Sequence, residues 1–172
     1  SGTTGHPKGA MQSHKAVIIN GAMTSQVHMR GPDDVVVSAL PCPHVYANVL
    51  MTGMMMFGTK LVLHKIFDPT KVLQDIKVHK ATLFDGVPTM YMFMLNSPAF
   101  SEADLSSLKR CYVGGQTMPI ATMLAVEKGF GVPLYELWGM TEIAGLGSTH
   151  PLYGENKHGS IGCAIPYCEL RI

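Results

Sequence analysis

The chain has 172 residues, of which 47% are hydrophobic and 15% are charged, and its formal net charge is +1. This composition is typical of a globular protein with a sizeable core, and it gives no reason to expect nucleic acid or a membrane surface as a partner. No signal-peptide pattern is visible, and the apolar run 49–63 is interrupted by Gly53, Gly58 and Lys60, so no transmembrane segment is expected. The cysteines form no C-x-x-C pair, so we expect reduced thiols in a cytoplasmic protein (Cys42, Cys111, Cys163 and Cys168).

Helical and extended patterns alternate along the chain. Helices are predicted over 14–28, where Ser13 can cap the first turn, and over 45–57, where an apolar segment has helical length. Further helices are predicted from 69, after the start signal Asp68-Pro69, from 88, at Pro88, and over 119–130. Short runs rich in β-branched residues predict strands at 34–40, 60–64, 81–87, 109–115 and 132–139. We therefore expect an α/β fold with a largely parallel sheet and flanking helices. Beyond Thr141 the pattern breaks into a loop, and residues 159–172 read as the start of a separate β element.

The opening residues, "SGTTGHPKG", combine three glycines, three hydroxyl side chains and Lys8. Glycines let backbone N–H groups converge on an anion, while hydroxyls add donors and a lysine adds positive charge. The P-loop and dinucleotide-binding patterns are both absent. The residues therefore predict a phosphate-binding loop, with a flexible linker as the alternative.

Six motifs, in order along the chain, carry a family resemblance. They are "SGTTGHPKGA" (1–10), "LPCPHVYA" (40–47), "GVPTM" (86–90), "YVGGQTMP" (112–119), "YELWGMTE" (135–142) and "GSIGCAIP" (159–166). Together they resemble the adenylate-forming superfamily of AMP-binding enzymes, and within it the acyl-CoA synthetases most closely.

The resemblance implies that the chain is an internal fragment of a longer enzyme. Residues 1–150 would be the nucleotide-binding α/β portion of the large N-terminal domain, and residues 151–172 would begin a β subdomain. The family's ribose-binding T-G-D segment, its hinge and its small C-terminal domain are not found in these residues. We therefore expect the fragment alone to be inactive and to self-associate.

The implied function of the parent is an ATP-dependent carboxylate–CoA ligase. Such an enzyme activates a carboxylic acid, here expected to be a fatty acid, as an acyl-adenylate and transfers it to coenzyme A, using ATP and Mg²⁺. Two alternatives stay open, an amino-acid-activating adenylation domain and a non-catalytic nucleotide-binding module. The first needs a pocket aspartate soon after the L-P-x-x segment, and none lies between Leu40 and Thr59.

By resemblance, the opening loop would bind the β- and γ-phosphates of ATP through Ser1, Gly2, Thr3, Thr4, Gly5 and Lys8. Thr141 would hydrogen-bond the α-phosphate, and Glu142 would bind Mg²⁺, a cation often held by one carboxylate and phosphate oxygens. Lys8, Thr141, Glu142 and His44 are the expected catalytic residues.

The resemblance also places the adenine and the acid. Adenine would lie between Gly114, Gly115 and Gln116 on one side and residues 136–140 on the other, with Trp138 stacked on it. The expected nucleotide-binding residues of this second segment are Glu136, Leu137, Trp138, Gly139 and Met140, followed by Thr141 at the α-phosphate. His44 would polarise the substrate carboxylate in a pocket that also contains Tyr46, Gly114 and Gln116. Gln116 departs from the small residue usual there, which leaves the acid's identity open.

Two further expectations concern coenzyme A and the acyl chain. Lys65 would contact a CoA phosphate, or else be an ordinary surface lysine. Some methionines of 51–56 would line an acyl tunnel, while most of them would lie in the core.

Overall fold

The computed structural model describes residue 6 and residues 8–171. Its helices are α1 (His14–Val27), α2 (Val45–Phe57), α3 (Pro69–His79), α4 (Pro88–Leu95), α5 (Ile120–Phe130) and the 3₁₀ turns η1 (Pro98–Glu102) and η2 (Thr141–Ile143). Its strands are β1 (Val35–Ser38), β2 (Lys60–Leu63), β3 (Leu83–Gly86), β4 (Arg110–Val113), β5 (Leu134–Met140), β6 (Gly145–Thr149) and β7 (Cys163–Ala164). Every helix and strand predicted up to residue 140 is present.

The strands form one sheet in the order β2-β1-β3-β4-β5-β6-β7. The first five of these in space are parallel, and β6 and β7 each pair antiparallel with their neighbour. The predicted α/β fold with a largely parallel sheet is confirmed. The expectation of a loop directly after Thr141 was wrong, because residues 145–149 form β6, and β7 extends the same sheet by pairing with it. The division at residue 150 into two parts stays a prediction.

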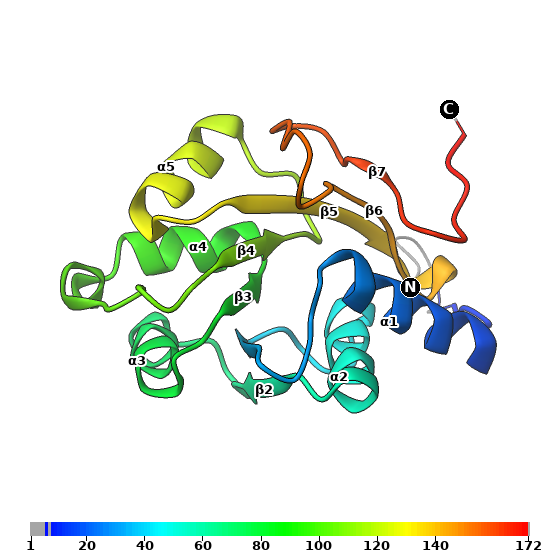
Figure 1. Ribbon diagram of the computed structural model, residues 1–172, viewed down its shortest axis with the longest axis horizontal. Coiled ribbons are helices and arrows are strands. Elements are labelled where there is room, and N and C mark those ends of the chain that lie inside the picture. Colours follow the sequence, from blue (N-terminus) through cyan, green and yellow to red (C-terminus); the bar gives the residue numbers. More distant parts are fainter. Residues whose placement is uncertain (1–5, 7, 172) are drawn as a thin grey trace.

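Helices cover both faces of the sheet (Figure 1). Helices α1 and α2 pack against each other and against β6 on one face, whereas α3, α4 and α5 form a contiguous row on the other face. This arrangement follows from right-handed connections between parallel strands. It leaves β2 as one edge of the sheet and the short β7 as the other.

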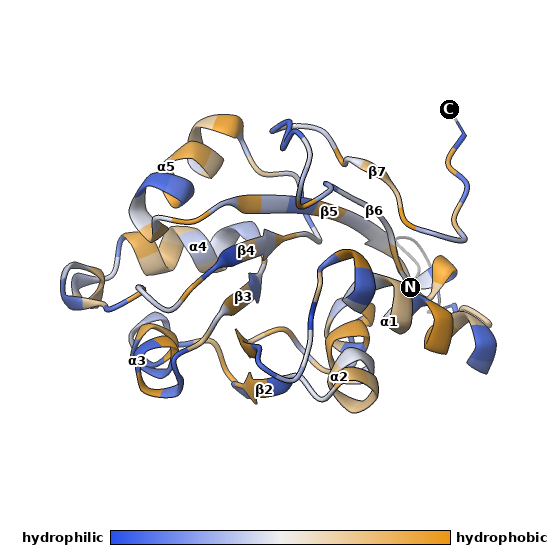
Figure 2. Ribbon diagram, in the orientation of Figure 1, coloured by the Kyte–Doolittle hydropathy of each residue, from blue (hydrophilic) through white to orange (hydrophobic). Residues whose placement is uncertain are grey.

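Local sequence signals explain where the helices begin. The Ser13 hydroxyl accepts from the Ala16 N–H at 3.1 Å at the start of α1, and Asp68 Oδ1 accepts from Thr70 and Lys71 before α3. Side-chain caps of this kind satisfy N–H groups that have no partner within the helix. Both hydrophobic and hydrophilic residues occur along α3 (Figure 2), and the buried ones are Val72, Leu73 and Ile76, as the helical pattern predicts.

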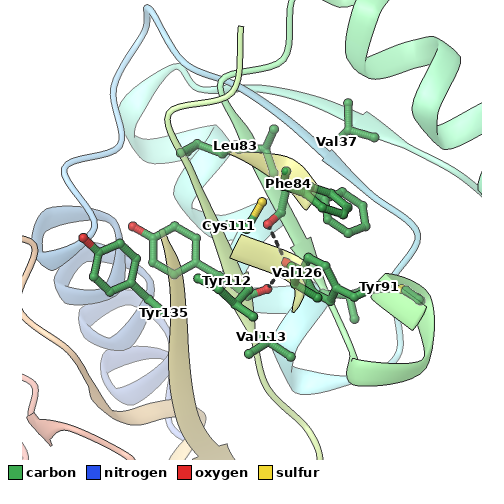
Figure 3. Close-up of a cluster of buried hydrophobic side chains, with 14 of the residues drawn as sticks. Val37, Leu83, Phe84, Tyr91, Cys111, Tyr112, Val113, Val126 and Tyr135 are labelled. Carbon is green, nitrogen blue, oxygen red and sulfur yellow. Dashed lines mark hydrogen bonds between the residues drawn. The ribbon is translucent and has the colours of Figure 1, made fainter. Parts of the chain in front are cut away.

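Aromatic side chains from neighbouring strands and α4 fill the core (Figure 3). Tyr91 is fully buried, and its hydroxyl donates to the carbonyl oxygens of Tyr112 at 2.7 Å and Phe84 at 3.2 Å. A buried tyrosine hydroxyl needs such partners, since an unpaired one costs free energy. This side chain therefore ties α4 to β3 and β4.

Two expectations about apolar segments are now decided. Met55 and Met56 are exposed, and Met51 and Met54 are only partly buried, so the prediction that most methionines of α2 lie in the core was wrong. Within the described residues no helix has the length and apolar character needed to cross a membrane.

Candidate active site

Most of the predicted site segments meet at one edge of the sheet, where the parallel strands have their carboxyl ends. The segment 40–47 follows β1, the turn 114–116 follows β4, and residues 141–142 follow β5. These strands belong to the parallel part of the sheet, with β3 between β1 and β4, so their carboxyl ends lie at the same edge, which is where open α/β sheets bind ligands. The predicted residues therefore share one region of the molecule.

A small pocket of about 40 Å³ opens at this edge, on the face of the sheet covered by α1 and α2. Five predicted residues line it: His44, Tyr46, Gly115, Leu137 and Gly139. Sequence reasoning missed its other lining residues, which are Thr24, His28, Arg30, Val45, Val49, Leu50, Gly145 and Leu146. The wall is mainly aliphatic, with polar groups from α1 and from the segment that follows it.

His44 is the N-cap of α2, and its Nδ1 accepts a hydrogen bond from the Tyr46 N–H at 3.2 Å. A neutral imidazole whose Nδ1 accepts carries its proton on Nε2. The side chain is exposed at the pocket. His44 can therefore offer an N–H donor to a substrate while its other nitrogen holds the ring in place.

Tyr46 lines the pocket, but its hydroxyl is engaged behind it. The hydroxyl donates to Asp85 Oδ1 at 3.1 Å, and the same oxygen accepts from Arg30 Nη2 at 2.8 Å. Asp85 has no exposed surface, and Arg30 is 8% exposed. Burial and the neighbouring Asp85 charge raise the pKa of Tyr46 well above its ordinary value. Tyr46 is therefore a neutral part of the pocket wall, and the hydrogen bond from its hydroxyl to Asp85 holds it in place.

A chain of polar contacts runs from Arg30 across the sheet. Arg30 Nη2 lies 3.4 Å from His28 Nδ1, and His28 Nε2 lies 3.2 Å from Thr149 Oγ1. The His28 ring stacks on Tyr112 with centroids 3.9 Å apart. Burial, followed by the charges of Arg30 and Arg110, lowers the pKa of His28 well below its ordinary value. A neutral His28 therefore accepts from Arg30 and donates to Thr149.

The sequence indicates that Asp85, one partner of the buried Arg30–Asp85 pair, needs a cation. Asp85 stands inside the apolar strand pattern "ATLFDGV", where an ionised carboxylate is costly unless it is paired. That position required a cationic partner, but the pattern could not identify Arg30, which is 55 residues earlier in the chain.

Close packing of the chain requires glycine in the turn 114–115 and at Gly139 in β5. A Cβ at Gly139 would lie 2.2 Å from the Gly145 carbonyl oxygen, and a Cβ at Gly114 would lie 2.3 Å from Leu137 Cδ1. Gly115 has a φ of +82°, which side chains other than glycine rarely adopt. These positions let β4, β5 and β6 come together at the site.

The other predicted nucleotide-binding residues lie beside the pocket without lining it. Trp138 is half-buried, and its ring packs on Gly147 of β6, whose Cβ would lie 2.6 Å from Trp138 Cζ3. Glu136 Oε2 accepts from the Gly159 N–H at 2.7 Å. Gln116, Met140 and Glu142 are exposed, whereas Gly114 is buried. Thr141 is half-buried, and its carbonyl oxygen accepts a hydrogen bond from Gln12 Nε2 at 2.5 Å.

Two predicted lysines stand apart from the pocket. Lys65 is exposed in the loop after the edge strand β2, and three strands, β1, β3 and β4, lie between β2 and β5. Lys8 is exposed as well. Ser1, Gly2, Thr3, Thr4 and Gly5 lie outside the described residues. Within residues 8–171 no group of three or more His, Cys, Asp or Glu side chains is placed to hold a metal ion.

Comparison with known proteins agrees with the motifs. A model of the family described as "AMP-binding enzyme" matches residues 1–172. The chain is 34% identical over 174 residues to the long-chain-fatty-acid–CoA ligase of Bacillus subtilis (strain 168), covering 99% of this chain and 31% of that protein. It is 35% identical to the indoleacetate–CoA ligase of Aromatoleum aromaticum, covering 100% and 34%. The chain thus spans about a third of the length of these relatives.

Solved structures are similar over the same region. The N-terminal domain of FACL13 from Mycobacterium tuberculosis, with a bound inhibitor, superposes with a TM-score of 0.86 at 28% identity, covering 97% of this chain and 42% of that one. The O-succinylbenzoate coenzyme A synthetase of Bacillus subtilis, in complex with AMP, gives 0.84 at 28% identity, covering 98% and 34%.

Proposed function

The chain belongs to the family of AMP-binding enzymes, and on that premise we propose that it is the nucleotide- and acid-binding part of a cytoplasmic carboxylate–CoA ligase. In this reaction the substrate carboxylate attacks the α-phosphorus of ATP, pyrophosphate leaves, and an acyl-adenylate forms. The thiol of coenzyme A then attacks the acyl carbon, AMP leaves, and a thioester results. The names of the relatives, which are CoA ligases for different acids, support this class.

One observation carries the proposal. The apolar pocket opens between His44, the turn at Gly115 and Gly139 of β5, at the carboxyl edge of the sheet. An acid with its chain in this pocket would hold its carboxylate at the edge where the phosphate-contacting residues of the motifs also lie. Such juxtaposition lowers the barrier by pre-orienting the reacting groups.

Each predicted catalytic group has a role in this arrangement. His44 Nε2–H would donate to the carboxylate and orient it, and Thr141 would donate to the α-phosphate. Lys8 would place positive charge beside the departing pyrophosphate. Glu142 is an exposed carboxylate at the same edge, which fits a cation that takes few protein ligands. Bound Mg²⁺ would neutralise phosphate charge.

The pocket wall favours an aliphatic acid. Val45, Val49, Leu50, Leu137 and Leu146 present branched aliphatic side chains to it. Hydrophobic burial of a hydrocarbon chain stabilises the complex by roughly 0.8 kcal/mol for each methylene group removed from water. We therefore propose a fatty or related carboxylic acid as the substrate.

The test is pyrophosphate release by the full-length protein that contains this sequence, supplied with ATP, Mg²⁺ and straight-chain acids. Lys8→Ala should lower kcat by a factor of about 100, in the range measured for removal of one preorganised donor to a developing charge. Lys128→Ala removes an exposed lysine on α5 and serves as the matched control. Equal rates for Lys8→Ala and the unmodified enzyme would refute the role of the loop.

An amino-acid-activating enzyme is the alternative. It requires an anionic group in the pocket for the substrate ammonium, and Asp85 is a carboxylate that contacts the pocket residues Tyr46 and Arg30 from behind the wall. Its charge is already balanced by Arg30 at 2.8 Å. Amino-acid-dependent pyrophosphate release without release by fatty acids would favour that alternative.

A further inference from the structure

We propose that Asp85, whose side chain does not itself line the pocket, is a positioning residue of the ligase and acts on His44 through the hydroxyl of Tyr46. The inference rests on the proposed function, in which His44 orients the substrate carboxylate. It gives the buried Arg30–Asp85 pair a role in the reaction.

The imidazole of His44 takes its position from the first turn of α2. His44 is the N-cap of this helix, and its Nδ1 accepts from the Tyr46 N–H at 3.2 Å. This is the one hydrogen bond that the ring makes within the described residues, and the side chain is otherwise exposed at the pocket. The direction in which Nε2–H points therefore depends on where the first turn of α2 lies on the sheet.

The side chain of Tyr46 connects that turn to the sheet. Tyr46 is buried, and its hydroxyl donates to Asp85 Oδ1 at 3.1 Å, whereas the Tyr112 carbonyl oxygen is farther away at 3.5 Å. Hydrogen bonds to a carboxylate are stronger than hydrogen bonds between neutral groups. The bond to Asp85 therefore holds the first turn of α2, and the N–H that carries His44, against displacement.

Asp85 is held firmly at the carboxyl edge of the sheet. It is the third residue of β3, which pairs with β1 on one side and with β4 on the other. Its backbone carbonyl accepts from the Ser38 hydroxyl at 2.8 Å, and its Oδ1 accepts from Arg30 Nη2 at 2.8 Å. Both the backbone and the side chain of Asp85 are thus fixed in the middle of the sheet, at the edge where the site lies.

Stability alone does not account for this charge pair. Two of its buried atoms, Arg30 Nε and Asp85 Oδ2, have no hydrogen-bond partner among the described residues. A buried ion pair is often no more stabilising than apolar side chains of similar size, but in some proteins such groups fix one arrangement of the elements around them. The contacts of Asp85 give the pair that role here, because they fix Tyr46 and, through its N–H, the ring of His44.

The experiment is a double-mutant cycle in the full-length enzyme, read out by acid-dependent pyrophosphate release. Tyr46→Phe removes the hydroxyl, keeps the ring in the pocket wall and leaves the Arg30–Asp85 hydrogen bond in place. It should lower kcat by about tenfold, since a displacement of about 1 Å can cost a factor of about 100, and change the KM for the acid by less than about twofold. In a His44→Ala background the same substitution should not lower kcat further, because residues that act as one unit are not additive.

Tyr91→Phe is the matched control. It removes another buried tyrosine hydroxyl that bonds to backbone carbonyls, in α4 and outside the pocket lining, so it should lower stability and leave kcat unchanged. Hydrogen exchange of the residue 46 amide gives a readout without turnover, and it should be about tenfold faster in Tyr46→Phe but unchanged in Tyr91→Phe. If Tyr46→Phe does not fold, as judged by circular dichroism, Asp85→Asn takes its place, because it removes the charge of the acceptor and keeps its shape.

The outcomes separate the two proposals. An unmodified enzyme without acid-dependent pyrophosphate release would refute the ligase proposal, and amide exchange would still decide whether Asp85 holds His44 through Tyr46. In an active enzyme, an unchanged kcat in Tyr46→Phe, or the same loss of kcat with and without His44, would overturn the positioning role alone. Unchanged exchange of the residue 46 amide in Tyr46→Phe would overturn it as well.

Discussion

The side-chain amide of Asn20 pairs with both backbone groups of Leu146, accepting from the N–H at 2.9 Å and donating to the carbonyl at 2.8 Å. The two residues are 126 positions apart, and both are buried. The amide therefore acts as a short piece of strand alongside β6. It attaches α1 to the part of the sheet that borders the pocket.

Replacing Asn20 by alanine should destabilise the fold strongly. Both backbone groups of Leu146 would lose their partner, at about 1–3 kcal/mol each. Chemical denaturation should show a fall of about 2–5 kcal/mol in the free energy of unfolding. Asn96→Ala removes an exposed amide that bonds only to Met92 within its own helix turn, and it should change stability by less than about 0.5 kcal/mol. Equal effects of the two substitutions would contradict the assigned role.

A methyl group at Gly139 should be tolerated poorly. The new Cβ would lie 2.2 Å from the backbone oxygen of Gly145, so β5 and β6 would have to separate. We expect Gly139→Ala to lower stability by about 2 kcal/mol or more, in the range seen for overpacked sites. Gly31→Ala is the control, since nothing lies within 4 Å of its Cβ position. Thermal unfolding of both variants tests this, and a Gly139→Ala protein as stable as Gly31→Ala would count against the close approach.

Stability should fall in acid because of His28. Its pKa is lowered well below the ordinary value of 6.5, so below pH 6.5 the unfolded chain binds a proton that the folded chain does not. The free energy of unfolding therefore decreases as the pH falls through this window, by up to about 1.4 kcal/mol per pH unit. Above pH 6.5 this contribution is fully present.

His28→Gln should reduce that slope, whatever it does to stability at neutral pH. His14→Gln, at an exposed position, should retain it. Unfolding measured between pH 5 and pH 8 for the three proteins is the test. A slope in His28→Gln as steep as in the unmodified protein would assign the acid sensitivity to other groups.

Glu142→Gln should raise the Mg²⁺ concentration needed for half-maximal pyrophosphate release more than it raises the KM for the acid. The substitution keeps the shape of the side chain and removes one anionic oxygen, the ligand that Mg²⁺ prefers. Titrations with Mg²⁺ and with the acid measure both effects in the full-length enzyme. An effect confined to the acid would move Glu142 to the carboxylate end of the pocket.

Local signals predicted most of the architecture correctly. Ser13 and the Asp68-Pro69 pair marked helix starts because a cap bonds N–H groups only two or three residues away. The strands up to β5 were visible because parallel central strands are buried on both faces and therefore read as continuous apolar runs. By contrast, β6 has the sequence "GLGST", in which four of the five residues are glycine, serine or threonine, and it has no such pattern.

The amino-acid sequence by itself determined the family, the alternation of helices and strands, and the segments that follow the strand ends. These properties depend on residues close together in the chain. Only the tertiary structure decided that Arg30 meets Asp85, that Asn20 bonds Leu146, and that Thr24 and His44 line one pocket. Such contacts depend on how α1 and α2 lie on the sheet. Packing sets that placement over many residues at once, so no short pattern encodes it.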